Sequence, residues 1–179
     1  MDNTDFASKY LEALRQGRFE VLKWLGRESR YIRVLIAFDM DGVLVRQVNP
    51  DCPNYDSMNA TRYIPENVRL FMILNQDPFI DCCILTGRHE KISMEIHKRF
   101  DCQVYCRFFD PDSEFEESLF KQVLIEYKTE ILNFLSENYD KVIYIDNHIE
   151  KFNPEEFTDK VRLFDMEQFS AFWRGIING

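Results

Sequence analysis

Two aspartates, Asp39 and Asp41, stand one residue apart, directly after the apolar run 34–38 and directly before Gly42. Because side chains alternate along an extended chain, residues two apart point to the same side, and both carboxylates face a common space. Close carboxylates repel each other unless a cation lies between them, and carboxylate oxygens combined with water suit Mg²⁺. The pair therefore indicates a magnesium-assisted site; the alternative is a polar strand end that caps a turn, since Asp-Gly is a common turn pair.

Side chains that could bind ligands or take part in catalysis also follow two other apolar runs. Thr86-Gly87-Arg88 follows residues 79–85, and Asp146 follows residues 141–145. A hydroxyl group followed by glycine and the start of a helix can donate to phosphate oxygens together with free backbone N–H groups, although Thr86 is equally suited to a simple N-cap. Open parallel sheets bind ligands at the carboxyl ends of their strands, so we expect Asp39, Thr86 and Asp146 to lie close together.

Short apolar runs and helical periodicity define the elements that must position these groups. We predict buried strands at 34–38, 79–85, 103–109, 141–145 and 161–164, and helices at 5–26, from Pro65, at 92–100, at 119–139 and over 169–177. The stretch from Val45 to Ile64 is rich in turn-forming residues and is predicted to be a long functional loop.

The chain resembles the haloacid dehalogenase (HAD) superfamily of phosphotransferases in four short motifs, in the right order. Residues 39–44 (Asp-Met-Asp-Gly-Val-Leu) resemble motif I, and residues 84–88 (Ile-Leu-Thr-Gly-Arg) resemble motif II. Lys128 fits motif III by spacing, with Lys121 as a rival, and Asp146 matches motif IV. Within the superfamily the second half looks most like the HAD-like domain called Swiss Army Knife RNA repair-like.

The resemblance implies an α/β fold, a doubly wound, Rossmann-like parallel sheet of five strands with the Asp39 strand central. It also implies roles: Asp39 is the nucleophile, Asp41 the general acid/base, and Thr86 and Lys128 hold the transferring phosphoryl group. The implied cofactor is Mg²⁺, bound by Asp39, Asp146 and the backbone carbonyl of Asp41.

Motif IV departs from the family pattern, which usually has two acidic residues. Here Asp146 is followed by Asn147 and, four places after Asp146, by Glu150. Either of these two could complete the metal site, and the sequence leaves the choice open.

The resemblance further implies a flap at Val45–Ile64 and no room for a large cap domain. An open site admits large substrates, so we expect a Mg-dependent phosphatase acting on a nucleic-acid end or another large phosphorylated molecule. Gly87, Arg88 and two flap arginines, Arg46 and Arg62, are the candidate substrate-binding residues. The alternatives are a small-molecule phosphatase, for nucleotides or sugar phosphates, and a non-catalytic binding module on the same scaffold.

Composition bounds the remaining possibilities. The 179 residues suit a core domain at 31–179 preceded by a basic helical segment at 1–30 packed on it. The net charge of −9 argues against broad capture of nucleic acid, and no apolar run reaches the roughly eighteen residues of a membrane span. An odd count of five cysteines favours reduced thiols and a cytoplasmic, or nuclear, location. The sequence determines neither the oligomeric state nor the role of the basic segment.

Overall fold

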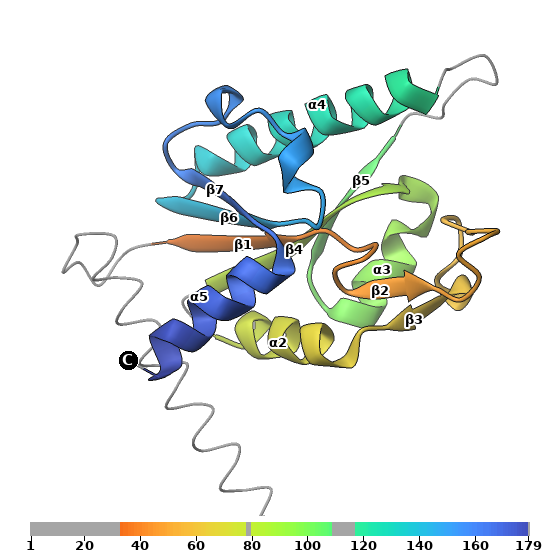
Figure 1. Cartoon of the computed structure of the whole chain (residues 1–179), viewed down its shortest axis with the longest axis horizontal. Helices are drawn as coiled ribbons and strands as arrows, with labels where there is room; N and C mark the ends of the chain where they lie inside the picture. The colour runs from red at the N-terminus through yellow and green to blue at the C-terminus, as the bar shows by residue number, and fades with distance from the viewer. Residues whose placement is uncertain (1–32, 78–79, 109–116, 179) are drawn as a thin grey trace, which may run out of the picture. The chain divides into compact units, whose positions relative to one another are not determined.

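The computed structural model describes residues 33–77, 80–108 and 117–178 (Figure 1). The chain divides into two compact units, Arg33–Met166 on the one hand and Met1–Ile32 with Glu167–Gly179 on the other. The predicted N-terminal helical segment at 1–30 therefore lies outside the described residues.

Five parallel strands form the sheet of the larger unit. They are β1 (Val34–Phe38), β4 (Ile80–His89), β5 (Gln103–Arg107), β6 (Lys141–Ile145) and β7 (Val161–Phe164), in the spatial order β5-β4-β1-β6-β7. The chain builds outward from β1 on one side and then crosses to build outward on the other, so the strand order reverses between β1 and β6. The predicted doubly wound, Rossmann-like α/β sheet with the Asp39 strand at its centre is confirmed, and such a reversal is where open sheets bind ligands.

Helices cover both faces of this sheet (Figure 1). On one face lie α2 (Pro65–Asn75) and α3 (Ser93–Phe100), and the Phe71 ring meets those of Phe38 and Phe100 edge to face, with centroids 5.2 and 5.5 Å apart. On the other face lies α4 (Glu117–Ser136), whose buried residues share a core with Leu35 and Ala37 of β1. Burial on both faces explains why the strands are unbroken apolar runs rather than alternating patterns.

Strand β4 is longer than predicted. Its pairing with β5 is interrupted by a bulge between Thr86 and His89, and the first helical turn, η2 (Glu90–Ile92), begins only after His89, whose Nδ1 accepts the Lys91 N–H at 3.1 Å. The prediction that Thr86-Gly87-Arg88 opens a helix was therefore wrong, and so was the N-cap alternative. A bulge keeps the backbone extended while it redirects the side chains that follow, and the sequence carries no local sign of it.

The flap is partly ordered as a hairpin rather than a plain loop. Strands β2 (Val45–Gln47) and β3 (Thr61–Tyr63) pair antiparallel, with the 3₁₀ turn η1 (Met58–Ala60) leading into β3. Three-residue strands are too short to show an alternating pattern, which is why the sequence predicted only turns. The segment between β1 and β4 is thus occupied by this hairpin and by α2.

Three short or terminal elements complete the chain. Two 3₁₀ turns, η3 (Ile149–Lys151) and η4 (Pro154–Glu156), connect β6 to β7. Helix α5 (Met166–Asn178) falls almost entirely in the second unit, and within it the rings of Phe169 and Trp173 stack with centroids 5.8 Å apart. All five cysteines lie among the described residues and are free thiols, and no described helix has the length and apolarity to cross a membrane.

The turn after β1 depends on Gly42. Its φ of +80° lies in the left-handed region, and its N–H donates to the Val45 carbonyl at 2.8 Å, which closes the turn. A Cβ at this position would collide with the side-chain amide of Asn147, in the loop after β6. The missing side chain therefore leaves room for the Asn147 amide, the end of an exposed side chain, to lie against the turn.

We predict that Gly42→Ala lowers the free energy of unfolding by about 1–3 kcal/mol, because it combines left-handed backbone strain with the Asn147 clash. Urea denaturation followed by circular dichroism measures the loss. Adding Asn147→Ala to the variant should recover the part due to the clash and leave the part due to backbone strain. Equal stability of Gly42→Ala and the parent protein would contradict this account of the turn.

Candidate active site

The register of the central strands brings Asp39 and Asp146 together. Phe38 pairs with Ile145 in the parallel β1–β6 ladder, so the next residue on each strand is one of the two aspartates. The ladder continues past the strand ends, since the Asp39 N–H donates to the Ile145 carbonyl at 2.7 Å. Both aspartates are buried, with 7% and 3% of their surface exposed. The site is therefore built into the sheet itself and not into a mobile loop.

Lys128 of α4 connects the two carboxylates. Its Nζ lies 2.8 Å from Asp146 Oδ2 and 3.1 Å from Asp39 Oδ1, and the lysine itself is only 6% exposed. One ammonium group thus contacts both acids. Because Asp39 Oδ1 and Asp146 Oδ2 are both bound to the same nitrogen, they must lie close to each other. The rival, Lys121, lies two turns earlier on α4, where it is exposed.

Burial and mutual charge set the protonation of this trio. Desolvation raises the pKa of Asp39 from 3.8 to about 7, and repulsion from Asp146 and Asp41 adds to it, while Lys128 opposes the rise. Burial also raises the pKa of Asp146, but the ammonium of Lys128 and three hydrogen bonds outweigh this effect, so the pKa is lowered. The pKa of Lys128 is raised, because attraction to both acids overcomes its desolvation. Lys128 therefore stabilises the charged form of both carboxylates.

Tyr144 is a member of this network that sequence reasoning missed. Its Oη donates to Asp146 Oδ2 at 2.7 Å, and the backbone N–H of His148 donates to Asp146 Oδ1 at 2.8 Å. Both oxygens of Asp146 are thereby oriented. The available signal was position: Tyr144 lies two residues before Asp146 on an apolar strand, and so on the same side of it.

Asp41 is held by a second, separate ion pair. The Nε and Nη2 atoms of Arg88 each lie 2.7 Å from one of its carboxylate oxygens, and Gln47 of the flap donates to Oδ1 at 3.2 Å. Arg88 is 1% exposed, and its Nη1 also contacts the Ser57 carbonyl of the flap at 3.4 Å. The predicted acid/base is thus oriented by a buried guanidinium that also holds the flap, while part of its carboxylate remains open to solvent.

These groups face a cavity of about 420 Å³. Its lining contains three of the predicted carboxylates, the bridging lysine and Gly87, together with three aromatic rings and three basic side chains: Asp39, Asp41, Tyr55, Gly87, Phe120, Lys121, Leu124, Ile125, Lys128, Asp146, His148, Lys151 and Phe152. Thr86 is fully buried near it, and its Oγ1 accepts the Arg88 N–H at 3.3 Å. A cavity with a charged floor and apolar walls suits a phosphate that carries an apolar group.

The two flap arginines are placed elsewhere. Arg46 and Arg62 stand directly opposite each other across the hairpin, and both are exposed. Gln47, the next residue after Arg46, points to Asp41, so alternation turns both arginines to the other face of the hairpin. The structure does not bring them to the cavity.

The donor set is compatible with magnesium. Among the described residues no three His, Cys, Asp or Glu side chains converge on one point. Mg²⁺ needs only one or two carboxylates beside water and substrate oxygens, and Asp39 and Asp146 supply two. Of the residues left open by the sequence, Asn147 lies against Gly42, and Glu150 lies 3.5 Å from His148 Nδ1.

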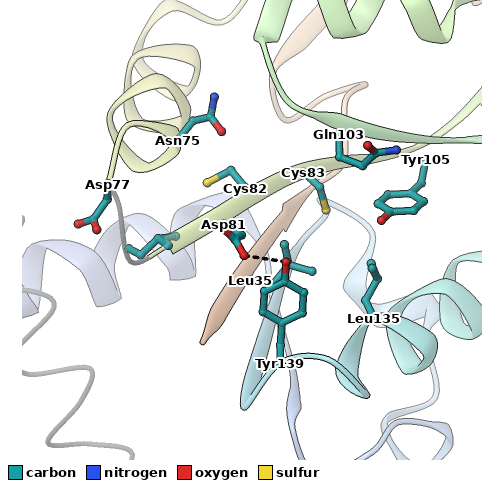
Figure 2. Close-up of a pocket in the computed structure, with 11 residues that line it drawn as sticks. Leu35, Asn75, Asp77, Asp81, Cys82, Cys83, Gln103, Tyr105, Leu135 and Tyr139 are labelled. Carbon is teal, nitrogen blue, oxygen red and sulfur yellow. Dashed lines mark hydrogen bonds between the residues drawn. The ribbon is translucent and has the colours of Figure 1, made fainter. Parts of the chain in front are cut away.

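A second cavity, of about 340 Å³, opens at the opposite edge of the sheet, near the amino ends of β1, β4 and β5 (Figure 2). There Asp81 accepts a hydrogen bond from Tyr139 Oη at 2.8 Å and pairs with Arg33 at 3.5 Å. Burial raises the pKa of the neighbouring Cys82 and Cys83 thiols, which makes them poor nucleophiles. The predicted catalytic groups all lie at the other edge.

No family model and no curated protein matches the chain. Three solved chains match in structure, and two of them are described here. One, from the Pnkp1/Rnl/Hen1 RNA repair complex, has a TM-score of 0.49 and 13% identity over 78% of this chain and 44% of its own. The other, from the Pnkp1/Rnl/Hen1 complex, has a TM-score of 0.46 and 14% identity over 76% and 47%. The chain thus spans less than half the length of either, and similarity at this level carries nothing about activity.

The raised pKa of Asp39 predicts a pH-dependent gain in stability when its charge is removed. Because the folded state binds this proton more tightly than the unfolded chain, the ionised carboxylate lowers stability progressively as the pH rises from 3.8 through about 7. In EDTA, Asp39→Asn should therefore melt several degrees above the parent at pH 8 (order of magnitude from the size of the shift), and the advantage should shrink toward pH 5. Differential scanning fluorimetry measures both. Exposed Asp51→Asn is the control, and a lower melting temperature for Asp39→Asn at pH 8 would refute the assignment.

Proposed function

We propose that this protein is a Mg-dependent phosphatase of the HAD type, which hydrolyses phosphate monoesters through an aspartyl-phosphate on Asp39. The observation that carries the proposal is the ammonium of Lys128, shared by Asp39 and Asp146 at the floor of a cavity that also contains Asp41. This arrangement would supply a nucleophile, a metal-binding carboxylate, a cation and an acid/base at one sheet edge. The free cysteines agree with work in a reducing compartment, the cytoplasm or nucleus.

The chemistry follows from these positions. An Asp39 oxygen attacks phosphorus, the bond from phosphorus to the leaving oxygen breaks, and Asp41 gives that oxygen a proton. Asp41 then takes a proton from water as the water oxygen attacks phosphorus, which releases phosphate and restores Asp39. Lys128 offsets the negative charge that gathers around the phosphoryl group.

The metal would be held by the carboxylates of Asp39 and Asp146 and by the backbone carbonyl of Asp41. When bound, Mg²⁺ supplies positive charge that neutralises the phosphoryl oxygens. Gly87 lines the same cavity and would bind a remaining oxygen, whereas Thr86 is fully buried and would have to become accessible to do so. The flap hairpin is too short to enclose a substrate, which favours a phosphate at the end of a larger molecule, such as a nucleic-acid end, over a small sugar phosphate.

One observation favours a different function, a non-catalytic phosphate-binding module. Asp41 is already engaged by both Nε and Nη2 of Arg88, and a carboxylate that keeps this pairing is poorly placed to exchange protons with a leaving group. In the phosphatase, Asp41 must turn part of its carboxylate to the substrate. Activity measurements distinguish the two functions.

We predict that Asp39→Asn lowers phosphatase activity on the order of a thousandfold or more while the protein remains folded, because the amide cannot attack phosphorus. Asp41→Asn should also be inactive, or should accumulate phospho-enzyme when the leaving group needs no proton. A colorimetric phosphate release assay and intact-protein mass spectrometry measure the two effects. Asp51→Asn, an exposed flap carboxylate, should match the parent, and full activity in pure Asp39→Asn would exclude it as the nucleophile.

We predict that EDTA removes the activity and that Mg²⁺ restores it. Asp146→Ala should raise the Mg²⁺ concentration for half-maximal rate by about tenfold or more, because it removes a direct ligand. Glu150→Ala should change it little, since that carboxylate is exposed and lies against His148. A Mg²⁺ titration of each variant provides the comparison. A larger effect of Glu150→Ala would transfer the metal-binding role from Asp146 to Glu150.

A further inference from the structure

Three aromatic rings line the cavity beside its charged floor, and none has a role in the chemistry proposed above. Phe152 belongs to the buried core, which leaves two rings that a ligand could reach. Tyr55 comes from the flap and Phe120 from α4, so the rings belong to different elements. Tyr55 is 48% exposed, which leaves much of its surface open to a ligand. Leu124 and Ile125 extend the apolar wall on the α4 side. Exposed aromatic surface next to a phosphate site calls for an apolar, planar partner.

Each of these rings contacts the guanidinium of a buried arginine. The Arg88 guanidinium carbon lies 5.8 Å from the centroid of Tyr55, and that of Arg107 lies 5.4 Å from the centroid of Phe120. Both arginines are anchored at the catalytic floor, Arg88 on Asp41 and Arg107 through Nε on the Gly87 carbonyl at 2.8 Å. Each ring thus has one contact to an arginine that is itself anchored beside the proposed catalytic groups. A ring held in place loses little freedom when a ligand stacks on it.

Basic side chains complete the pattern. Lys121 and Lys151 line the same cavity and are exposed, although the protein as a whole carries a net charge of −9. Lysines beside aromatic rings can bind additional negative charge on a ligand, close to a planar group of the same ligand. A sugar phosphate would instead need hydrogen-bonding groups along the wall, where Phe120, Leu124 and Ile125 stand.

We propose, on the basis of the phosphatase function above, that this cavity selects nucleoside phosphates, with the nucleobase stacked on Tyr55 and Phe120 next to the reacting phosphate. Tyr55 and Phe120 are then specificity-determining residues. Free nucleotides and phosphorylated nucleic-acid ends share this chemistry, since both place a base near a terminal phosphate. Stacking of bases on aromatic side chains does not depend on the base, so the preference should extend to all four.

The kinetic test compares two substrates that differ only in the base, adenosine 5′-monophosphate and ribose 5-phosphate. The parent should prefer the nucleotide, and Tyr55→Leu and Phe120→Leu should each lower the ratio of the two kcat/KM values about tenfold. Tyr63→Leu and Phe134→Leu are matched controls, because these rings are 45% and 58% exposed on the same hairpin and helix but do not line the cavity. A 5′-phosphorylated trinucleotide separates nucleic-acid ends from free nucleotides, and preference for either agrees with the proposal.

Three results would overturn it: an unchanged ratio in Tyr55→Leu and Phe120→Leu, an equal fall in the controls, or a parent enzyme that prefers a phosphotyrosine peptide to the nucleotide. In each of these cases hydrolysis itself continues, so the phosphatase function stands while the nucleobase inference fails.

A binding test keeps the two conclusions separate if no hydrolysis is found. The fluorescence of 2-aminopurine riboside 5′-monophosphate is quenched when the base stacks, and Asp39→Asn protein with Mg²⁺ permits the measurement without turnover. Quenching that disappears on adding Tyr55→Leu, but persists on adding Tyr63→Leu, supports the nucleobase site even in an inactive protein. Absence of quenching, or quenching that Tyr55→Leu leaves intact, refutes it.

Discussion

The site depends on one buried ammonium group between two buried carboxylates. Without Lys128, Asp39 and Asp146 would be adjacent negative charges with little access to water, which is among the most costly arrangements a protein interior can hold. Its cation makes the pair tolerable, and in doing so ties α4 to the ends of β1 and β6. Removing Lys128 would leave both carboxylates uncompensated, so the docking of the helix and the charge balance of the site depend on each other.

A second ion pair lies at the same edge but is anchored differently. Arg88 and Asp41 compensate each other, and both contact the flap, Arg88 through the Ser57 carbonyl and Asp41 through Gln47. Asp39, Lys128 and Asp146 are held by the sheet and α4. Arg88 and Asp41 are instead held between the sheet and the flap. The orientation of Asp41 therefore depends on the position of the flap, which offers a physical route by which contacts at the flap would reach the proposed acid/base.

The two faces of the flap hairpin have different surroundings. Gln47 and Tyr55 turn toward the catalytic groups, whereas Arg46 and Arg62 face solvent on the opposite side. Like charges directly across a hairpin repel each other, and exposure to water reduces that cost. In the proposed phosphatase, selectivity for the group next to the phosphate would rest with the aromatic wall of the cavity, because these arginines do not line it.

The sequence by itself determined the five strands of the main sheet and, for β1 and β6, the residue that follows the strand. Strands buried on both faces are rich in apolar residues, and in these two the first acidic residue, Asp39 or Asp146, follows the strand end directly. The order of α/β elements and the four motifs likewise led to the doubly wound sheet. These features could be predicted because each depends on a short run of neighbouring residues.

Only the tertiary structure decided which long side chains reach the site. Lys121 and Lys128 lie about 10 Å apart along one face of α4, and the docking of the helix selects Lys128. The β4 bulge, invisible in sequence, keeps Thr86 to Arg88 out of a helix, and Arg88 pairs with Asp41. The alternation of side chains along the three-residue strands of the hairpin turns Arg46 away from the cavity. Each outcome depends on contacts between segments far apart in the chain, and no local pattern records them.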